Sequence, residues 1–396
     1  MKRIAILLSG HSLAALATLT RNLVLARMLG PENYALAVAL IVLLAAAEMA
    51  TTLGLPQQIV SHKQGGTRQH QNALQTVQLL RGLIGAAIVL AIATPLANAL
   101  DAPDARYIFV IASCIPLLLG IKHLDPFRFQ RQQRHLPHIL VLGLPPALSF
   151  LALWPVTTIW SGPIVMLYLM LFQTILTVVI SHAVSRRRYC LRLSRPHFRT
   201  ALRFGLPLAG NGVLMLAVLH AEKVIAGVQL GLSEMGILAM GITLTLTPAL
   251  ISARCLQAYY LPKLKGTDHS ILGISFLSAA ALAIALSASV PLFLPILGHD
   301  FEALAGMIPL LSLIAACRLP KSALATAALA QGRTHLPAFA NIPRAIAAPI
   351  IWVALANGGT IHTMLVIALT AEIAGLAVGY FMGRKQSTPA NRLVNP

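Results

Sequence analysis

The sequence predicts an all-α, polytopic membrane protein with about twelve transmembrane helices, and three observations support this fold class. The 396-residue chain is 57% hydrophobic and only 10% charged, whereas roughly a quarter of the residues in soluble domains are charged. Its apolar residues form long uninterrupted runs, among them residues 34–55, 83–100, 271–297 and 361–382. Its basic residues collect in the short connections between such runs.

Each of these runs is long enough to cross a hydrocarbon layer of about 30 Å at a rise of about 1.5 Å per residue. Lipid offers the backbone no hydrogen-bonding partners, so a crossing segment must be a helix or a strand of a closed barrel. Barrel strands are short and alternate apolar with polar residues, and these runs do neither. The runs therefore predict helices.

The expected helices follow one another in two groups. The first group covers residues 4–29, 34–55, 72–100, 105–121, 138–160 and 164–184. The second group covers residues 201–230, 235–260, 271–297, 303–316, 336–355 and 361–382. Gly30-Pro31 supplies a turn after the first helix. Lys2 and Arg3 resemble the start of a signal peptide, but the apolar run continues to residue 29 with no separate mature domain behind it, which favours an uncleaved first helix.

Every second connection is basic. The basic segments are residues 2–3, 63–68, 122–134, 186–199, 263–265, 321–333 and 384–392. The connections between them, around residues 32, 101–106, 234, 300–302 and 357–359, hold little positive charge. Because basic connections stay on the cytoplasmic side, this alternation predicts an even number of helices with both termini in the cytoplasm. The formal net charge of +19 therefore reflects membrane topology and does not indicate nucleic-acid binding.

The longest basic stretch, residues 185–203, lies near the middle of the chain and predicts two lobes of about six helices each, at 1–190 and 191–396. A weak internal repeat supports this division, because residues 21–33 and 222–234 align with Leu-Gly in register. Two parallel lobes of this kind place a substrate path at their interface. Since the two lobes supply a complete cavity, we expect a monomer.

The sequence contains no pattern typical of an enzyme or a metalloprotein. It has no G-x-x-x-x-G-K-[ST] phosphate-binding loop, and none of its 13 histidines belongs to an H-E-x-x-H pattern. Its cysteines are scattered, without the C-x-x-C spacing of metal or disulfide sites, at positions Cys114, Cys190, Cys255 and Cys317. We therefore expect no catalytic residues, no cofactor and no metal, and we do not expect an enzyme.

Three segments resemble a known family. Residues 21–34 (RNLVLARMLGPENY), 202–208 (LRFGLPL) and 260–264 (YLPKL) resemble the corresponding segments of oligosaccharide flippases of the polysaccharide transport group. That Wzx-like group belongs to the multidrug/oligosaccharidyl-lipid/polysaccharide (MOP) exporter superfamily. The resemblance covers essentially the whole chain in helix number, connection charge and repeat.

The resemblance implies a transporter of the bacterial cell inner membrane. Such a protein flips a polyprenyl-pyrophosphate-linked oligosaccharide from the inner to the outer leaflet by alternating access between its lobes. The implied partners are the lipid-linked oligosaccharide, membrane lipids and, as a further candidate, the polysaccharide polymerase machinery. Two alternatives stay open at this point: a small-molecule exporter similar to the multidrug and toxin extrusion (MATE) transporters, and a membrane-embedded enzyme of polysaccharide assembly.

The candidate site residues are charged residues within spans, because lipid burial of a charge is costly and such residues usually face a cavity or a partner. The basic ones are Arg21, Arg81, Lys223, Arg254, Arg318 and Arg344. The resemblance implies a cationic cavity for a pyrophosphate group, and it points first to Arg21 and Arg254. Arginine suits this role because its planar fork grips phosphate oxygens with two hydrogen bonds. The alternative is that such residues extend to the lipid head groups.

Two acidic residues, Glu48 and Glu372, also lie well inside predicted spans. One hypothesis is ion coupling, in which a carboxylate binds a proton or a sodium ion in one state and releases it in the other. The alternative is a structural ion pair with one of the arginines.

Overall fold

The computed structural model describes residues 2–260, 270–330 and 336–385, and every regular element within these ranges is a helix. The chain forms two compact units, one extending to Leu216 and the other beginning at Ala217. The boundary lies within the long helix α10 (Arg195–Gln229). The basic connection predicted at 263–265, together with Arg333 and residues 386–392, lies outside the described ranges.

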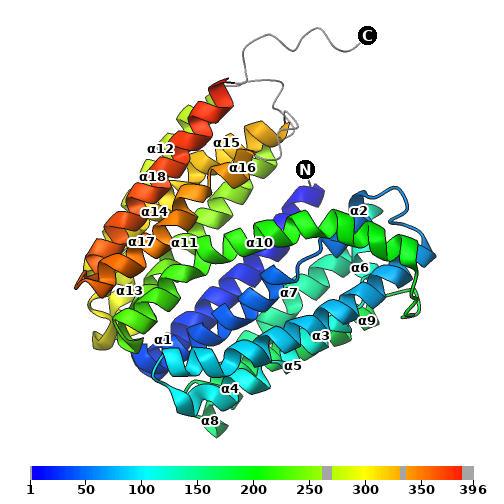
Figure 1. The fold of residues 1–396 in the computed structure, drawn as a ribbon, viewed down its shortest axis with the longest axis horizontal. Coiled ribbons are helices and arrows are strands. Elements are labelled where there is room, and N and C mark those ends of the chain that lie inside the picture. The colour runs from blue at the N-terminus through cyan, green and yellow to red at the C-terminus, as the bar shows by residue number, and fades with distance from the viewer. Residues whose placement is uncertain (1, 261–269, 331–335, 386–396) are drawn as a thin grey trace. The chain divides into compact units, whose positions relative to one another are not determined.

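The first unit begins with α1 (Lys2–Ala50), which breaks at Gly30. A straight helix of 49 residues would be more than 70 Å long, over twice the thickness of the hydrocarbon layer. Gly30 has φ 70° and ψ 171°, a backbone conformation essentially restricted to glycine, and Pro31 follows it. Figure 1 shows the two arms of α1 running in opposite directions. The predicted turn at Gly30-Pro31 is therefore present, and the second arm ends at Ala50, five residues before the predicted end.

The rest of the first unit contains long and short helices (Figure 1). Its elements after α1 are α2 (Leu55–Ser61), α3 (Arg68–Ala99), η1 (Pro103–Ala105), α4 (Arg106–Ile111), α5 (Cys114–Gly120), α6 (Asp125–Arg131), α7 (Leu136–Leu151), α8 (Leu153–Ile159), α9 (Ile164–Ala183) and the start of α10. The helix predicted at 105–121 is thus divided into α4 and α5. The short helices α2 and α6 lie in segments for which the sequence predicted only connections.

The second unit contains the remainder of α10 and the helices that follow it. These are α11 (Leu232–Tyr260), α12 (Ser270–Ala288), α13 (Val290–Leu297), η2 (His299–Phe301), α14 (Leu304–Ala316), α15 (Arg318–Ala330), α16 (Leu336–Phe339), α17 (Ile342–Ala356) and α18 (Ile361–Lys385). A patch of small side chains packs α11, α12 and α14 together around Ala249, Ala279 and Ala315.

Within the described residues, 8 helices are long and apolar enough to cross a membrane. The number rises to 10 when the bent pairs α7–α8 and α12–α13, each bent by 42°, are counted as single spans. The kinked α1 counts once in these numbers, and α17 is a shorter apolar helix. The chain is therefore a multi-pass helical membrane protein, while the count of about twelve crossings stays a prediction.

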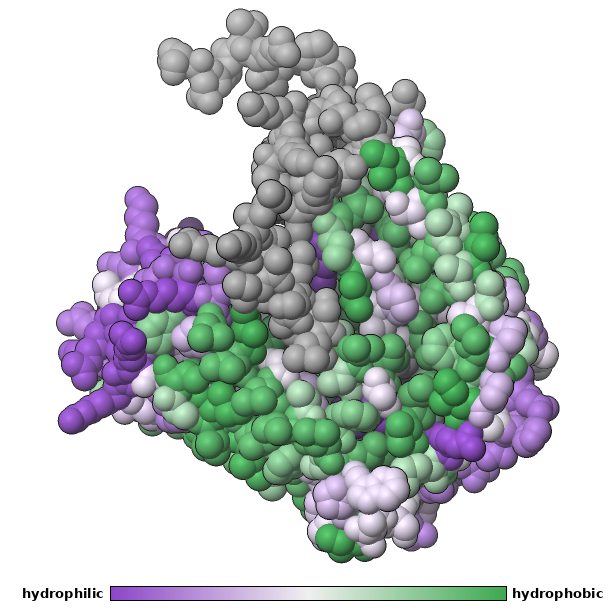
Figure 2. Space-filling view, turned by 180° about the vertical axis from the view of Figure 1, so that it is seen from behind, coloured by the Kyte–Doolittle hydropathy of each residue, from purple (hydrophilic) through white to green (hydrophobic). Residues whose placement is uncertain are grey.

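The surface agrees with this assignment. Large apolar side chains such as Leu83, Ile84, Leu277 and Ile284 are at least half exposed. Figure 2 shows such side chains as broad hydrophobic areas, with hydrophilic residues at the margins. Exposed apolar surface of this extent is typical of a protein that contacts lipid.

Three basic connections of the first unit meet at one of its ends. Arg131 Nη1 donates to the carbonyls of Val60 and His62, at 2.9 and 2.7 Å, which joins the α6 segment to the connection after α2. Arg187, after α9, donates to Gln71 Oε1 at 2.7 Å. The predicted alternation of basic and non-basic connections requires these three basic connections to lie on one side of the membrane. Their contacts place them at the same end of the first unit. The assignment of that side to the cytoplasm stays a prediction.

Candidate functional site: a cationic pocket and a buried charge cluster

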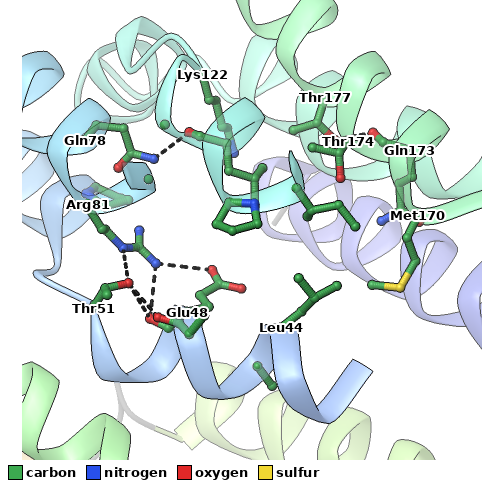
Figure 3. Close-up of a pocket in the computed structure, with 18 of the residues that line it drawn as sticks. Leu44, Glu48, Thr51, Gln78, Arg81, Lys122, Met170, Gln173, Thr174 and Thr177 are labelled. Carbon is green, nitrogen blue, oxygen red and sulfur yellow. Dashed lines mark hydrogen bonds and ion pairs between the residues drawn. The ribbon is translucent and has the colours of Figure 1, made fainter. Parts of the chain in front are cut away.

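A pocket of about 510 Å³ opens within the first unit (Figure 3). It lies between the second arm of α1, helix α3, the α5–α6 segment and α9. Its polar lining residues are Glu48, Thr51, Gln78, Arg81, Lys122, Gln173, Thr174 and Thr177. Its apolar lining includes Leu44, Phe127 and Met170. The pocket therefore offers polar groups and an apolar wall to the same ligand.

Arg81 is held firmly at the edge of this pocket. Its Nε donates to Thr51 Oγ1 at 3.3 Å, and its Nη2 donates to the backbone carbonyl of Glu48 at 3.3 Å (Figure 3). The carboxylate of Glu48 is a looser partner, with Oε1 3.6 Å from Nη2. The Glu48 side chain is 66% exposed and that of Arg81 only 17%. Two hydrogen bonds of Arg81 therefore do not depend on the Glu48 carboxylate.

Lys122 supplies a second positive charge to the pocket. Its Nζ lies 5.6 Å from the centre of the Phe127 ring, a cation–π distance. Within the described ranges, no carboxylate lies at ion-pair distance from this ammonium group. The pocket thus contains two cations and one loosely paired acid, which gives it an attraction for anions.

A stripe of glutamines on α3 brings Lys122 beside Arg81. Gln71, Gln75 and Gln78 follow a 4-3 spacing and share one helix face with Arg81. Gln75 Nε2 donates to the carbonyl of Lys122 at 2.6 Å, and Gln78 Nε2 donates to the carbonyl of Leu119 at 2.8 Å. These hydrogen bonds satisfy carbonyls at the end of α5 and hold that end against α3.

A glycine contact brings the two helices still closer. A Cβ atom at Gly82 would lie 2.6 Å from the Pro116 carbonyl and 2.7 Å from Gly120 Cα, so only glycine fits between α3 and α5 at this level. Small residues that let two helix backbones approach are common in membrane proteins. This close approach places Arg81, the residue before Gly82, at the pocket.

Arg21, the first predicted site residue, is buried on the first arm of α1, with 4% of its surface exposed. Its Nη1 donates to Ser149 Oγ at 3.0 Å and to Gln173 Oε1 at 2.7 Å. Its Nε has no hydrogen-bonding partner in the described residues, and no carboxylate there forms an ion pair with it. Because Gln173 also lines the pocket, Arg21 is connected to the pocket wall through one side chain.

The second unit holds a buried charge cluster, which we define as Glu222, Lys223, Arg318, Lys321, Arg344 and Glu372. Glu372 is fully buried and lies 2.8 Å from Lys321 Nζ, 3.4 Å from Arg318 Nη2 and 3.6 Å from Arg344 Nε. Arg344 Nη2 also pairs with Glu222 Oε1 at 2.6 Å. Helices α10, α15, α17 and α18 each contribute to the cluster.

The structure thus divides the predicted site residues between the two units. Arg21, Glu48 and Arg81 lie at or beside the pocket of the first unit, and Lys223, Arg318, Arg344 and Glu372 form part of the buried charge cluster. Arg254, on α11, is exposed and outside that cluster. For Glu372 the structure supplies the ion pairs that the structural alternative requires. Ion coupling by Glu48 or Glu372 stays a prediction.

Sequence reasoning missed Lys122 and Lys321, because both were counted among the basic connections at helix ends. It also missed Gln173 and the glutamine stripe, although the 4-3-3 spacing of Gln71, Gln75, Gln78 and Arg81 was visible. Polar residues repeating on one face of an apolar helix are a signal of this kind of site. Among the described residues, no group of His, Cys, Asp or Glu side chains is arranged to hold a metal ion.

The fold resembles that of known membrane transporters. The structure is similar to the inward-facing conformation of a MATE family multidrug resistance transporter of the MOP superfamily, with a TM-score of 0.71 and 16% identity over 95% of this chain and 96% of that one. It is similar to an outward-facing MATE transporter, with a TM-score of 0.62 and 17% identity over 97% and 95% of the chains. A MOP superfamily transporter from Pyrococcus furiosus Vc1 (DSM3638) matches with a TM-score of 0.64 and 17% identity over 97% and 94%. The chain therefore has the MOP transporter fold.

The family follows from the sequence. The model of a family described as "Polysaccharide biosynthesis protein" matches residues 24–268, more than half of the chain. The chain belongs to this polysaccharide biosynthesis family, as the resemblance of its helix-end motifs predicted. No curated protein sequence matches it significantly.

Proposed function

We propose that this chain is a transporter that flips a polyprenyl-pyrophosphate-linked oligosaccharide from the inner to the outer leaflet by alternating access. The family match supports a role in polysaccharide biosynthesis, and the fold supports transport. The observation on which the substrate assignment rests is the pocket of the first unit, where Arg81 and Lys122 face one exposed carboxylate beside an apolar wall. As further parts of the proposal, the protein is a monomer of the bacterial inner membrane and works beside polysaccharide polymerase machinery.

The pocket chemistry suits the junction between a lipid and its phosphates. A pyrophosphate group presents several charged oxygens, and charge-assisted hydrogen bonds from Arg and Lys are about twice as strong as neutral ones. Leu44, Phe127 and Met170 line the same pocket and can contact the first units of a prenyl chain. An anionic amphiphile can therefore bind the cations and the apolar lining of the pocket at the same time.

Release is as important as binding in a transporter. The carboxylate of Glu48 lies 3.6 Å from Arg81 and competes with a phosphate for the same guanidinium group. Thr51 and the Glu48 carbonyl keep that group in place when the ligand leaves. This competition limits the affinity and allows the head group to be released in the outward state.

The test is transport in cells that depend on this chain. Arg81→Gln and Lys122→Gln remove one cation each, and both should lower export of lipid-linked oligosaccharide about tenfold or more, because charged hydrogen bonds contribute about 1.5–3 kcal/mol. The measurement is the amount of lipid-linked oligosaccharide retained on the cytoplasmic leaflet, with membrane levels of each variant checked.

The matched control is Arg106→Gln, which removes an exposed arginine on α4 that does not line the pocket. It should export normally. Normal export by both pocket variants would contradict the proposed site. Increased sensitivity to cationic drugs in the same variants would favour the alternative, a MATE-like exporter of small molecules.

The driving force is a separate part of the proposal. We propose that Glu48 or Glu372 takes up a proton or sodium ion during the cycle. Transport that is unaffected when both ion gradients are collapsed would exclude this coupling.

A further inference from the structure

The buried charge cluster of the second unit has an unbalanced charge. Its cations are Lys223, Arg318, Lys321 and Arg344, and its only carboxylates are Glu222 and Glu372. The ion-paired members alone, three cations and two carboxylates, leave one positive charge in excess, and Lys223, the chain neighbour of Glu222, adds a second. Burying uncompensated charge away from water is costly, and a membrane protein gains no help from the surrounding lipid.

Two guanidinium N–H groups in the cluster also have no hydrogen-bonding partner within the described residues: Arg318 Nε and Arg344 Nη1. Arg344 is 4% exposed, so water from outside does not reach its side chain freely. A buried donor left without a partner costs about 1–3 kcal/mol, and more when it is charged. The acceptor Glu372 Oε1 is likewise without a hydrogen-bonding partner among the described residues, so the cluster is short of negative charge and its donors are not all matched by acceptors within reach.

A small cavity adjoins these groups. It has a volume of about 20 Å³, and its polar lining consists of Glu222, Thr245, Arg318 and Arg344. The remaining lining residues are apolar: Val218, Leu219, Ile242, Leu246, Leu311, Ile314 and Ala315. One water molecule needs roughly 10–15 Å³ of such space, so the cavity accommodates a single particle of about that size. A phosphate or pyrophosphate group is too large for it.

We propose that this cavity is a binding site for a monovalent halide ion, chloride in the cell. A water molecule would satisfy a free N–H group but leave the excess charge unchanged, whereas a halide accepts hydrogen bonds from both arginines and removes one unit of that charge. Glu222 does not oppose this strongly, because its carboxylate is already paired with Arg344 at 2.6 Å. The inference is independent of the proposed transport function, since it concerns an ion held between helices of the second unit.

Bromide provides the direct test, because it replaces chloride and has an anomalous X-ray signal. Crystals of the full chain grown in sodium bromide should show an anomalous peak within hydrogen-bonding distance of the Arg318 and Arg344 side chains. Bromide found only on the surface, or density at this position without an anomalous signal, would mean that the cavity holds water and would overturn the proposal.

Stability in solution provides a second test. At constant ionic strength, the thermal unfolding midpoint of the purified chain should rise as gluconate is replaced by chloride or bromide, since a ligand that binds only the folded state stabilises it. Ala315→Val places two methyl groups at the cavity wall and should abolish this rise. Ala279→Val makes the same change in the same packed patch without lining the cavity, and it should retain the rise.

An equal midpoint in gluconate and chloride overturns the proposal, and so does a halide response that persists in a folded Ala315→Val variant. If Ala315→Val does not fold, the bromide map of the unmodified chain decides. Both tests are independent of transport, so their failure leaves the proposed function standing.

Discussion

At the residue scale, the buried arginines Arg21 and Arg344, each 4% exposed, are compensated in different ways. Arg344 forms ion pairs with Glu222 and Glu372. Arg21 is equally buried, and its hydrogen bonds within the described residues go to the neutral side chains of Ser149 and Gln173. Neutral dipoles stabilise a buried cation less than a carboxylate does, so Arg21 retains much of its attraction for an anion. An arginine that pairs with carboxylates joins the helices that carry them, whereas an arginine beside a pocket with only neutral partners is suited to an anionic ligand.

This difference predicts opposite outcomes for the same substitution. Arg21→Gln leaves no carboxylate unpaired, so the free energy of unfolding should change by about 1 kcal/mol or less while export falls. Arg344→Gln leaves Glu222 and Glu372 with fewer partners and should destabilise the chain by about 3–5 kcal/mol. Thermal unfolding and export are measured for both variants. Strong destabilisation by Arg21→Gln would show that Arg21 is structural.

A second residue-scale prediction concerns pH at the basic end of the first unit. Burial lowers the pKa of His123, an effect that the charge of Asp125 opposes in part. Its Nδ1 accepts from the backbone N–H of Asp125 at 3.0 Å, which requires a neutral nitrogen. Burial alone would raise the pKa of Asp125, but the hydrogen bonds from Arg128 and the backbone of Arg186 outweigh it and lower the pKa.

Both groups therefore bind fewer protons in the folded state than in the unfolded state at acidic pH, so stability falls as pH falls. The contribution of His123 is lost below about pH 6.5 and that of Asp125 below about pH 4. The measurement is the unfolding midpoint between pH 7.5 and pH 5. His123→Gln should flatten this pH dependence relative to the unmodified chain, and an unchanged slope would refute the assignment.

At the element scale, the helix ends were predictable where special residues mark them. Gly30-Pro31 predicted the break in α1 because Gly30 adopts a conformation that other residues avoid. The short helices α2 and α6 were not predicted, since each has only 7 residues and an isolated helix of that length is not stable in water. They form because tertiary contacts hold them, such as Leu55 and Ile59 packing with Leu74 and Leu124.

The α1 break gives an element-scale prediction. Gly30→Ala places a Cβ atom on a residue with φ 70° and ψ 171°, which should destabilise the chain by about 1–3 kcal/mol. Gly210→Ala, inside α10, has nothing within 4 Å of the new methyl group and should be neutral or slightly stabilising. Thermal unfolding of the two variants is compared in detergent. Equal midpoints would mean that the turn between the arms tolerates any residue.

At the scale of the whole molecule, composition and charge alternation were enough to predict an all-helical membrane protein. They also named the charged residues in spans, including Arg81, Arg344 and Glu372. They could not show which of these residues meet, because packing between helices distant in the sequence decides that. The glutamines of α3 hold the segment that carries Lys122 beside Arg81, and Lys321 pairs with Glu372 across α15 and α18. The grouping of these residues into a site could therefore be identified only from the structure.

The last prediction concerns the orientation of the chain in its membrane. The native Cys190 is exposed in the basic connection after α9, and Asp104 is exposed on η1. The predicted crossings at 105–121, 138–160 and 164–184 lie between them, and an odd number of crossings puts the two positions on opposite sides. With Cys114, Cys255 and Cys317 replaced by alanine, a membrane-impermeant maleimide should label Cys190 only in inverted vesicles. A cysteine in place of Asp104 should be labelled only in intact spheroplasts.

Labelling of both positions from one side of the membrane would refute the crossing count. Exchanged labelling would keep the count but place the basic end outside, where a head group delivered from the cytoplasm could not first encounter it.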